Sequence, residues 1–126
     1  MNTSLNIENL TEYNLQGLLE LSGDDISFVT EILNDVVVIS PDTAAKMKGA
    51  MDNDDVQELA SEAHKYKSTL NILQCASLVD LLNHIETQAE NGNKSLLKEN
   101  VHQACLAITL LTSKIQQELE RFSKAA

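Results

Sequence analysis

Three histidines are the side chains of this 126-residue chain that titrate near neutral pH without any perturbation. They are His64, His84 and His102, and each falls in a different stretch of helical periodicity. With helical residues spaced by about 100°, each imidazole points more than about 110° away from the centre of its own apolar stripe. All three are therefore predicted to face solvent, and His84 and His102 are expected to be ordinary surface side chains.

The neighbours of His64 set it apart from the other two histidines. Of the four residues one helical turn away, Ala60, Ser61 and Ser68 are small, and the fourth is Lys67. A neutral imidazole is a nucleophile at neutral pH, and small neighbours leave it approachable. An ammonium three residues further on can neutralise charge on a transferred phosphoryl group. These are the features that a phosphoryl acceptor needs, but taken alone the pattern is weak, because a histidine and a lysine at this spacing on a helix are more often an accidental surface pair.

Other catalytic motifs are absent from the sequence. It has no glycine-rich phosphate loop, no H-E-x-x-H, no G-x-S-x-G and no paired C-x-x-C. ATP binding and kinase activity are therefore not expected. A metal-binding helical enzyme is a weaker alternative, because the histidines lie on separate helices without a carboxylate–histidine pair at i, i+4. No metal site and no resident cofactor are predicted.

The composition indicates a small, acidic protein of the cytoplasm. A net charge of −10 argues against nucleic acid as a partner, because duplex binding needs lysines and arginines to neutralise phosphates. The polar N-terminus is not a signal peptide, and no apolar run is long enough to span a bilayer, so no direct membrane binding is expected. Cys75 and Cys105 lie in apolar runs and are expected to be reduced core residues.

Apolar residues recur at helical spacing nearly everywhere, and Gly and Pro are rare. The pattern predicts a short helix near residues 12–21, a second helix that Ser40-Pro41 breaks, and a third near 42–51. Longer helices are predicted near 55–73, from Ser77 or a neighbour to 91, and near 95–124. Together they predict an all-α, antiparallel four-helix bundle with additional short N-terminal helices. It is expected to be a monomeric single domain over residues 1–126, with its bundle core at about 54–124 and its N-terminal helices at about 12–51.

One segment of the predicted fourth helix resembles a family signature. Ala63-His64-Lys65-Tyr66-Lys67-Ser68-Thr69 is similar to the A-H-x-L-K-G-S motif of histidine-phosphotransfer (HPt) domains. The resemblance extends over roughly residues 18–111. It includes three further matches: a Gly-Asp pair that precedes a helix containing a phenylalanine, a proline after the following apolar run, and an Asn-Gly pair at the end of a later helix. These further matches are Gly23-Asp24 with Phe28, Pro41, and Asn91-Gly92.

The resemblance implies roles for particular residues. His64 would be the phosphoacceptor, reacting through Nε2, and Lys67 would stabilise the phosphoryl oxygens. Glu86 matches a family position, usually Gln or Glu, that can hydrogen-bond the histidine from the neighbouring helix; the alternative is an ordinary exposed carboxylate. The residues expected at the partner-contact surface are Lys65, Ser68 and Ser61.

The implied function is a phosphorelay intermediate that takes a phosphoryl group from a receiver-domain aspartate and passes it to another receiver domain. Mg²⁺ would come with the receiver. Ser68 and Gln74 replace two glycines that are frequent in the family, and Cys75 stands where the family favours Ala. These departures keep one alternative open, in which the bundle is a non-catalytic adaptor for a signalling partner and His64 is incidental.

Overall fold

A computed structural model describes residues 6–125, and within this range every regular element is an α-helix. The all-α prediction is therefore confirmed. The helices are α1 (Ile7–Leu10), α2 (Gln16–Leu21), α3 (Ile26–Asp52), α4 (Val56–Ile72), α5 (Ala76–Asn91) and α6 (Lys94–Ala125). None of these described helices is both long and apolar enough to cross a membrane.

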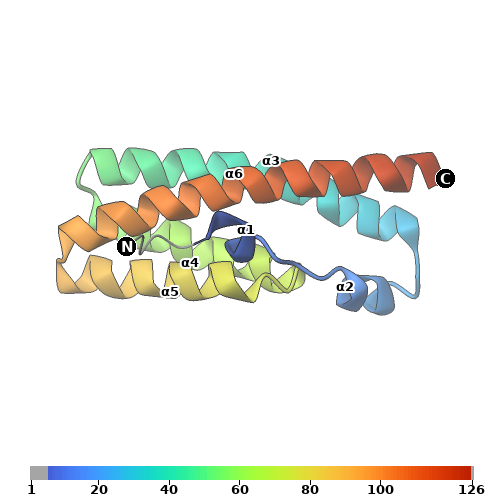
Figure 1. Cartoon of the computed structure of the whole chain (residues 1–126), viewed down its shortest axis with the longest axis horizontal. Helices are drawn as coiled ribbons and strands as arrows, with labels where there is room; N and C mark the ends of the chain where they lie inside the picture. Colours follow the sequence, from blue (N-terminus) through green and yellow to red (C-terminus); the bar gives the residue numbers. More distant parts are fainter. Residues whose placement is uncertain (1–5, 126) are drawn as a thin grey trace.

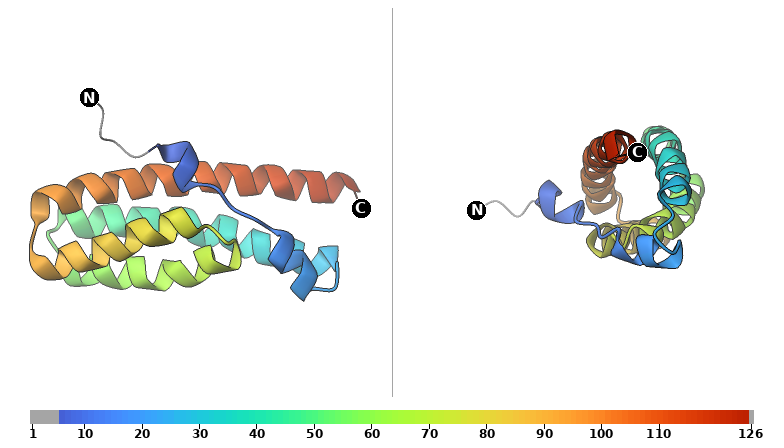
Figure 2. Two further views of the ribbon diagram at one scale, coloured as in Figure 1. Left: turned by 60° about the horizontal axis from the view of Figure 1, so that its bottom comes forward. Right: turned by 90° about the vertical axis from the view of Figure 1, so that its right-hand side faces the viewer.

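The four long helices form an antiparallel bundle. Each packs against two neighbours, so that α4 lies between α3 and α5, and α6 closes the ring against α5 and α3 (Figure 2). The helices α3 and α6 extend past the ends of α4 and α5, and α2 lies beside this extension of α3 (Figure 1). The short α1 packs on α5 and α6. The predicted four-helix bundle with additional short N-terminal helices is confirmed.

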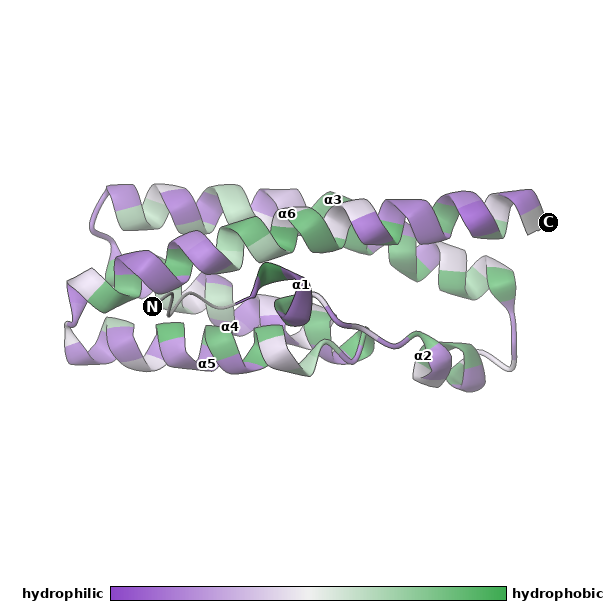
Figure 3. Ribbon diagram, in the orientation of Figure 1, coloured by the Kyte–Doolittle hydropathy of each residue, from purple (hydrophilic) through white to green (hydrophobic). Residues whose placement is uncertain are grey.

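Each long helix turns an apolar stripe toward the bundle axis, and polar and apolar residues alternate along every ribbon (Figure 3). On α4 the core side chains are Leu59, Ala63, Tyr66 and Leu70, all buried. Because they occupy one face at steps of three and four residues, the residue after Ala63 must point away from the core. This residue is His64.

The prediction that Ser40-Pro41 breaks a helix is wrong, because α3 continues from Ile26 to Asp52 with Pro41 inside it. Proline removes one backbone donor, at a cost of about 3 kcal/mol in a free helix. Burial on both sides of the proline outweighs this loss: Ser40 is fully buried with its hydroxyl 2.6 Å from the Tyr66 hydroxyl, and Met47 is buried beyond it. The predicted second and third helices are thus one, and the bundle takes in α3 as well as residues 54–124.

The N-terminal segment also differs in detail from the prediction. The short helix expected from residue 12 begins at Gln16, and α1 was not predicted at all. The residues between them form a non-helical connection that runs along the bundle, where the Asn14 N–H donates to the Leu73 carbonyl at 2.8 Å and the Tyr13 hydroxyl donates to Glu118 at 2.7 Å. These long-range contacts, which sequence periodicity does not report, hold the segment against the bundle.

The turn between α4 and α5 explains one departure from the family pattern. Gln74, which replaces a frequent glycine, has φ of 55°, in the left-handed region that glycine enters most easily. Its side chain lies against Gly17 of α2, where an added Cβ would overlap the Gln74 amide nitrogen. The chain therefore accommodates a side chain at position 74 by having none at position 17.

Replacing Gln74 with glycine is expected to stabilise the fold by about 0.5–1 kcal/mol, because glycine relieves the unfavourable left-handed conformation. Urea denaturation followed by circular dichroism measures the change. Gln116→Gly is the matched control: Gln116 is exposed within α6, where the same exchange is expected to destabilise by about 0.5–1 kcal/mol. A loss of stability in both variants would contradict the conformational explanation.

Candidate functional site

His64 lies on the outer face of α4 with its side chain 71% exposed. Ser61 and Ser68, one turn before and after it, are exposed as well. The Ser68 hydroxyl donates to the carbonyl of Lys65 at 2.9 Å, so it is folded back on its own helix. Nothing on α4 covers the imidazole, and a second protein can approach it.

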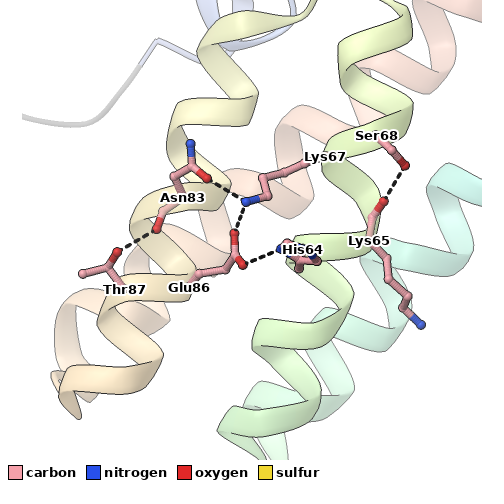
Figure 4. A network of polar contacts seen from close by, with 7 residues as sticks. All are labelled: His64, Lys65, Lys67, Ser68, Asn83, Glu86 and Thr87. Atoms are coloured by element: carbon pink, nitrogen blue, oxygen red, sulfur yellow. Dashed lines mark hydrogen bonds and ion pairs between the residues drawn. The ribbon is translucent and has the colours of Figure 1, made fainter.

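Glu86 reaches the His64 ring from the neighbouring helix α5. Its Oε1 is 3.0 Å from His64 Nδ1 (Figure 4). An ionised carboxylate can only accept a hydrogen bond, so the ring proton is assigned to Nδ1. In this tautomer Nε2 carries the free lone pair.

Lys67 completes a network across the interface between α4 and α5. Its ammonium donates to Glu86 Oε2 at 2.5 Å and to Asn83 Oδ1 at 2.8 Å (Figure 4). The Lys67 side chain is only 20% exposed, which is unusual for lysine. Two ordered acceptors and this partial burial hold the cation in one place.

The same contacts determine the charge of Glu86. Burial alone would raise the pKa of its carboxyl, but the hydrogen bonds from Lys67 and His64 outweigh burial and lower the pKa. Glu86 is therefore ionised at neutral pH. It links the nucleophile candidate and the cation through its two oxygens.

Lys65 lies on the opposite side of α4, toward α3. Its ammonium is 2.8 Å from Oε2 of Glu62, a carboxylate that is almost completely buried. Burial favours the neutral acid, but the hydrogen bond from Lys65 and the positive charges of Lys65 and Lys46 lower the pKa of Glu62. The two lysines that follow His64 in the sequence are thus held by different carboxylates on different sides of the helix.

Of the predicted site residues, the structure joins three in one network: His64, Lys67 and Glu86. The other three, Lys65, Ser61 and Ser68, are exposed on α4 within four residues of His64, but they do not enter the network. Sequence reasoning missed Asn83 and Glu62. Asn83 stands three residues before Glu86 and so shares its face of α5, which was the one signal available for it.

The remaining histidines are exposed, as predicted, on α5 and α6. His84 donates from Nδ1 to the Asp80 carbonyl at 2.8 Å. No group of three or more His, Cys, Asp or Glu side chains within residues 6–125 is arranged to hold a metal ion. Both cysteines are free, and burial raises the pKa of Cys75 to about 11 and also raises the pKa of Cys105.

An apolar groove opens on the same side of the molecule as His64. On α4, His64, Ser68 and Ile72 follow one another at four-residue spacing and therefore share one face. Ile72 is 45% exposed and lines a groove of about 420 Å³ between α2, α3 and the end of α4. The apolar side chains that line this α2–α4 groove are Leu18, Leu21, Phe28, Ile32 and Ile72.

Comparison with known proteins identifies one family. A family model described as "Hpt domain" matches residues 31–125, a range that contains His64, Lys67, Asn83 and Glu86. No curated protein and no solved structure matches the chain.

Proposed function

Because the chain belongs to the histidine-phosphotransfer (Hpt) domain family, a family of phosphotransfer carriers in two-component phosphorelays, we propose that His64 carries the phosphoryl group. The donor is a phosphorylated receiver-domain aspartate, and the acceptor is the aspartate of another receiver domain. One observation carries the choice of His64: its ring is exposed and donates from Nδ1 to Glu86, which leaves Nε2 free to react.

In the forward step, Nε2 of neutral His64 attacks the phosphorus atom in line. The phosphorus–oxygen bond to the donor aspartate breaks, and this carboxylate leaves with the electron pair. The imidazole retains its proton on Nδ1 and becomes a phosphorylated imidazolium. No proton is transferred in this step, and Glu86 stabilises the positive charge that the ring acquires.

In the onward step, an aspartate of the second receiver attacks the phosphorus atom. Because Nδ1 is still protonated, the ring leaves as a neutral imidazole, which is a far better leaving group than an imidazolate anion. The hydrogen bond to Glu86 therefore favours transfer in both directions. The Lys67 ammonium stabilises the equatorial phosphoryl oxygens through its remaining N–H.

A divalent cation is expected to arrive with the receiver. Among residues 6–125, Glu86 is the one carboxylate in contact with His64 and Lys67, and those two residues already engage it. A Mg²⁺ ion normally requires several free oxygen ligands. We therefore assign the metal to the partner and not to this chain.

The α2–α4 groove is proposed as the docking surface for the receiver. It opens about two helical turns beyond His64 on the same face of α4, and its exposed apolar side chains would be covered by a partner that also reaches the ring. Lys65, Ser61 and Ser68, which are exposed on α4 near His64, are proposed as polar contacts of the receiver outside the groove. An apolar centre with a polar rim is the usual composition of a protein interface.

Introducing a charge into the groove is expected to weaken docking. Phe28→Glu or Ile72→Glu should lower the rate of receiver-dependent phosphorylation by at least about tenfold at subsaturating receiver, which corresponds to about 1.4 kcal/mol. Phosphorylation of His64 by phosphoramidate, a small donor that needs no docking, should be unchanged. Leu106→Glu is the control, because Leu106 is 45% exposed on α6, diagonally across the bundle from α4. Equal losses in all three variants would remove the docking assignment.

The function itself is tested by following the phosphoryl group. A panel of purified receiver domains is labelled with radioactive acetyl phosphate, freed of the donor and mixed with the chain. We expect acid-labile, base-stable label on the chain, and mass spectrometry should locate it on His64. Stable receiver binding without any phosphohistidine would instead favour the adaptor function, and label on a different side chain would exclude His64 as the carrier.

A further inference from the structure

The proposed function leaves Asn83 without a role, although this residue contacts the functional network directly. The Lys67 ammonium has three N–H donors. One is taken by Glu86 at 2.5 Å, and a second is taken by Asn83 Oδ1 at 2.8 Å. One donor is left over for a group that arrives from outside.

The chemistry of the Asn83 side chain suits this place. Glu86 already contributes a full negative charge next to Lys67. An amide oxygen adds a second anchor but does not cancel the positive charge of the ammonium. A second carboxylate at position 83 would hold Lys67 equally well. It would, however, give Lys67, Glu86 and residue 83 together a net negative charge, which would repel an anionic phosphoryl group.

The position of Asn83 argues against a role in the core. Its side chain is exposed on the surface of α5, and its backbone carbonyl accepts a hydrogen bond from the Thr87 hydroxyl at 3.1 Å, one turn further along the helix (Figure 4). Asn83 and Glu86 are three residues apart and present their oxygens to Lys67 from the same face of α5. The contact with Lys67 is the only side-chain hydrogen bond that Asn83 makes among the described residues.

We propose that Asn83 is a positioning residue for phosphoryl transfer. Its amide oxygen fixes the Lys67 ammonium at the interface of α4 and α5, so that the third N–H points to the phosphoryl group on His64. Without the amide, a flexible lysine side chain must lose its rotamer freedom each time the phosphoryl group arrives. This inference rests on the proposed function, because it requires His64 to be phosphorylated.

The experiment compares Asn83→Ala, Asn83→Asp, Lys67→Met and the double variant Lys67→Met/Asn83→Ala. Wild-type chain is first shown to form phosphohistidine at position 64 with phosphoramidate, so that a failure of the proposed function is seen separately. Single-turnover rates are then measured at saturating phosphoramidate. We expect Asn83→Ala to be about 5–10-fold slower than the wild type, and Asn83→Asp to be slower still, because the acid neutralises Lys67.

The double variant separates positioning from a general structural effect. If Asn83 acts through Lys67, adding Asn83→Ala to Lys67→Met should cause no further loss of rate. An independent multiplicative loss, or full activity of Asn83→Ala or Asn83→Asp, would overturn the inference. Thr87→Val is the matched control, since it changes the same turn of α5 without removing a Lys67 partner, and it should retain the wild-type rate.

A spectroscopic signature complements the rates. In the wild type, the Lys67 ammonium should give a resolved nitrogen resonance at low temperature, because its two acceptors slow the exchange of its protons with water. Asn83→Ala should broaden or remove this resonance, whereas Thr87→Val should not. An unchanged Lys67 resonance in Asn83→Ala would show that the amide does not hold the cation.

Discussion

A chain carrying His64→Gln is expected to accept no measurable phosphoryl group, a loss of more than about a thousandfold from any receiver or from phosphoramidate. Glutamine retains polarity and can still donate to Glu86, but its amide nitrogen has no available lone pair. Because the His64 side chain is 71% exposed, the substitution should change the free energy of unfolding by less than about 0.5 kcal/mol. The measurement is the transfer of radioactive label from a phosphorylated receiver, followed by thermal unfolding of the same sample.

His84→Gln and His102→Gln are the matched controls for this prediction. Both histidines are exposed on helices of the same bundle, and neither belongs to the network around Glu86. Each control should accept label at the wild-type rate. Label that reaches His64→Gln as readily as the wild type would refute the carrier function of His64, whatever the behaviour of the controls.

Much of the site could be predicted from the sequence because it depends on helix geometry. The apolar stripe of α4 determines which way His64 points, and steps of three and four residues determine which small side chains surround it. The proximity of Glu86 to His64 was predicted from the family resemblance. The register between two packed helices is set by interdigitating core side chains, so it cannot be predicted from the sequence of either helix alone.

Three features could not be obtained in this way. The continuity of α3 through Pro41 depends on the burial of Ser40 against Tyr66, a contact between distant segments. The burial of Glu62 requires Lys65 as its partner, and sequence periodicity alone places a charged residue on the surface. The contact of Asn83 with Lys67 crosses from α5 to α4. In each instance a tertiary contact overrides or supplements what the local sequence pattern predicts.

The separation of Lys65 from Lys67 leads to the second large prediction. Lys67→Met should lower the maximal rate of phosphoryl transfer at saturating receiver by about a hundredfold, in the range expected when one preorganised charge is removed from a transition state. Methionine keeps much of the length and apolar character of the side chain, which suits a residue that is 20% exposed. Single-turnover transfer from a phosphorylated receiver is measured over a range of receiver concentrations. It provides both the maximal rate and the receiver concentration at which the rate is half-maximal.

Lys65→Met removes the same charge from the same helix and is therefore the decisive comparison. Lys65 is 63% exposed and paired with Glu62 toward α3, whereas Lys67 shares a carboxylate with His64 itself. Losing Lys65 should shift the receiver concentration at half-maximal rate, because rim charges act mainly on association, and should leave the maximal rate within about threefold. If transfer depended only on the general positive potential around His64, the two variants would lose maximal rate equally. A hundredfold loss confined to Lys67→Met would instead locate the stabilising charge at the one ammonium that Glu86 and Asn83 hold beside the ring.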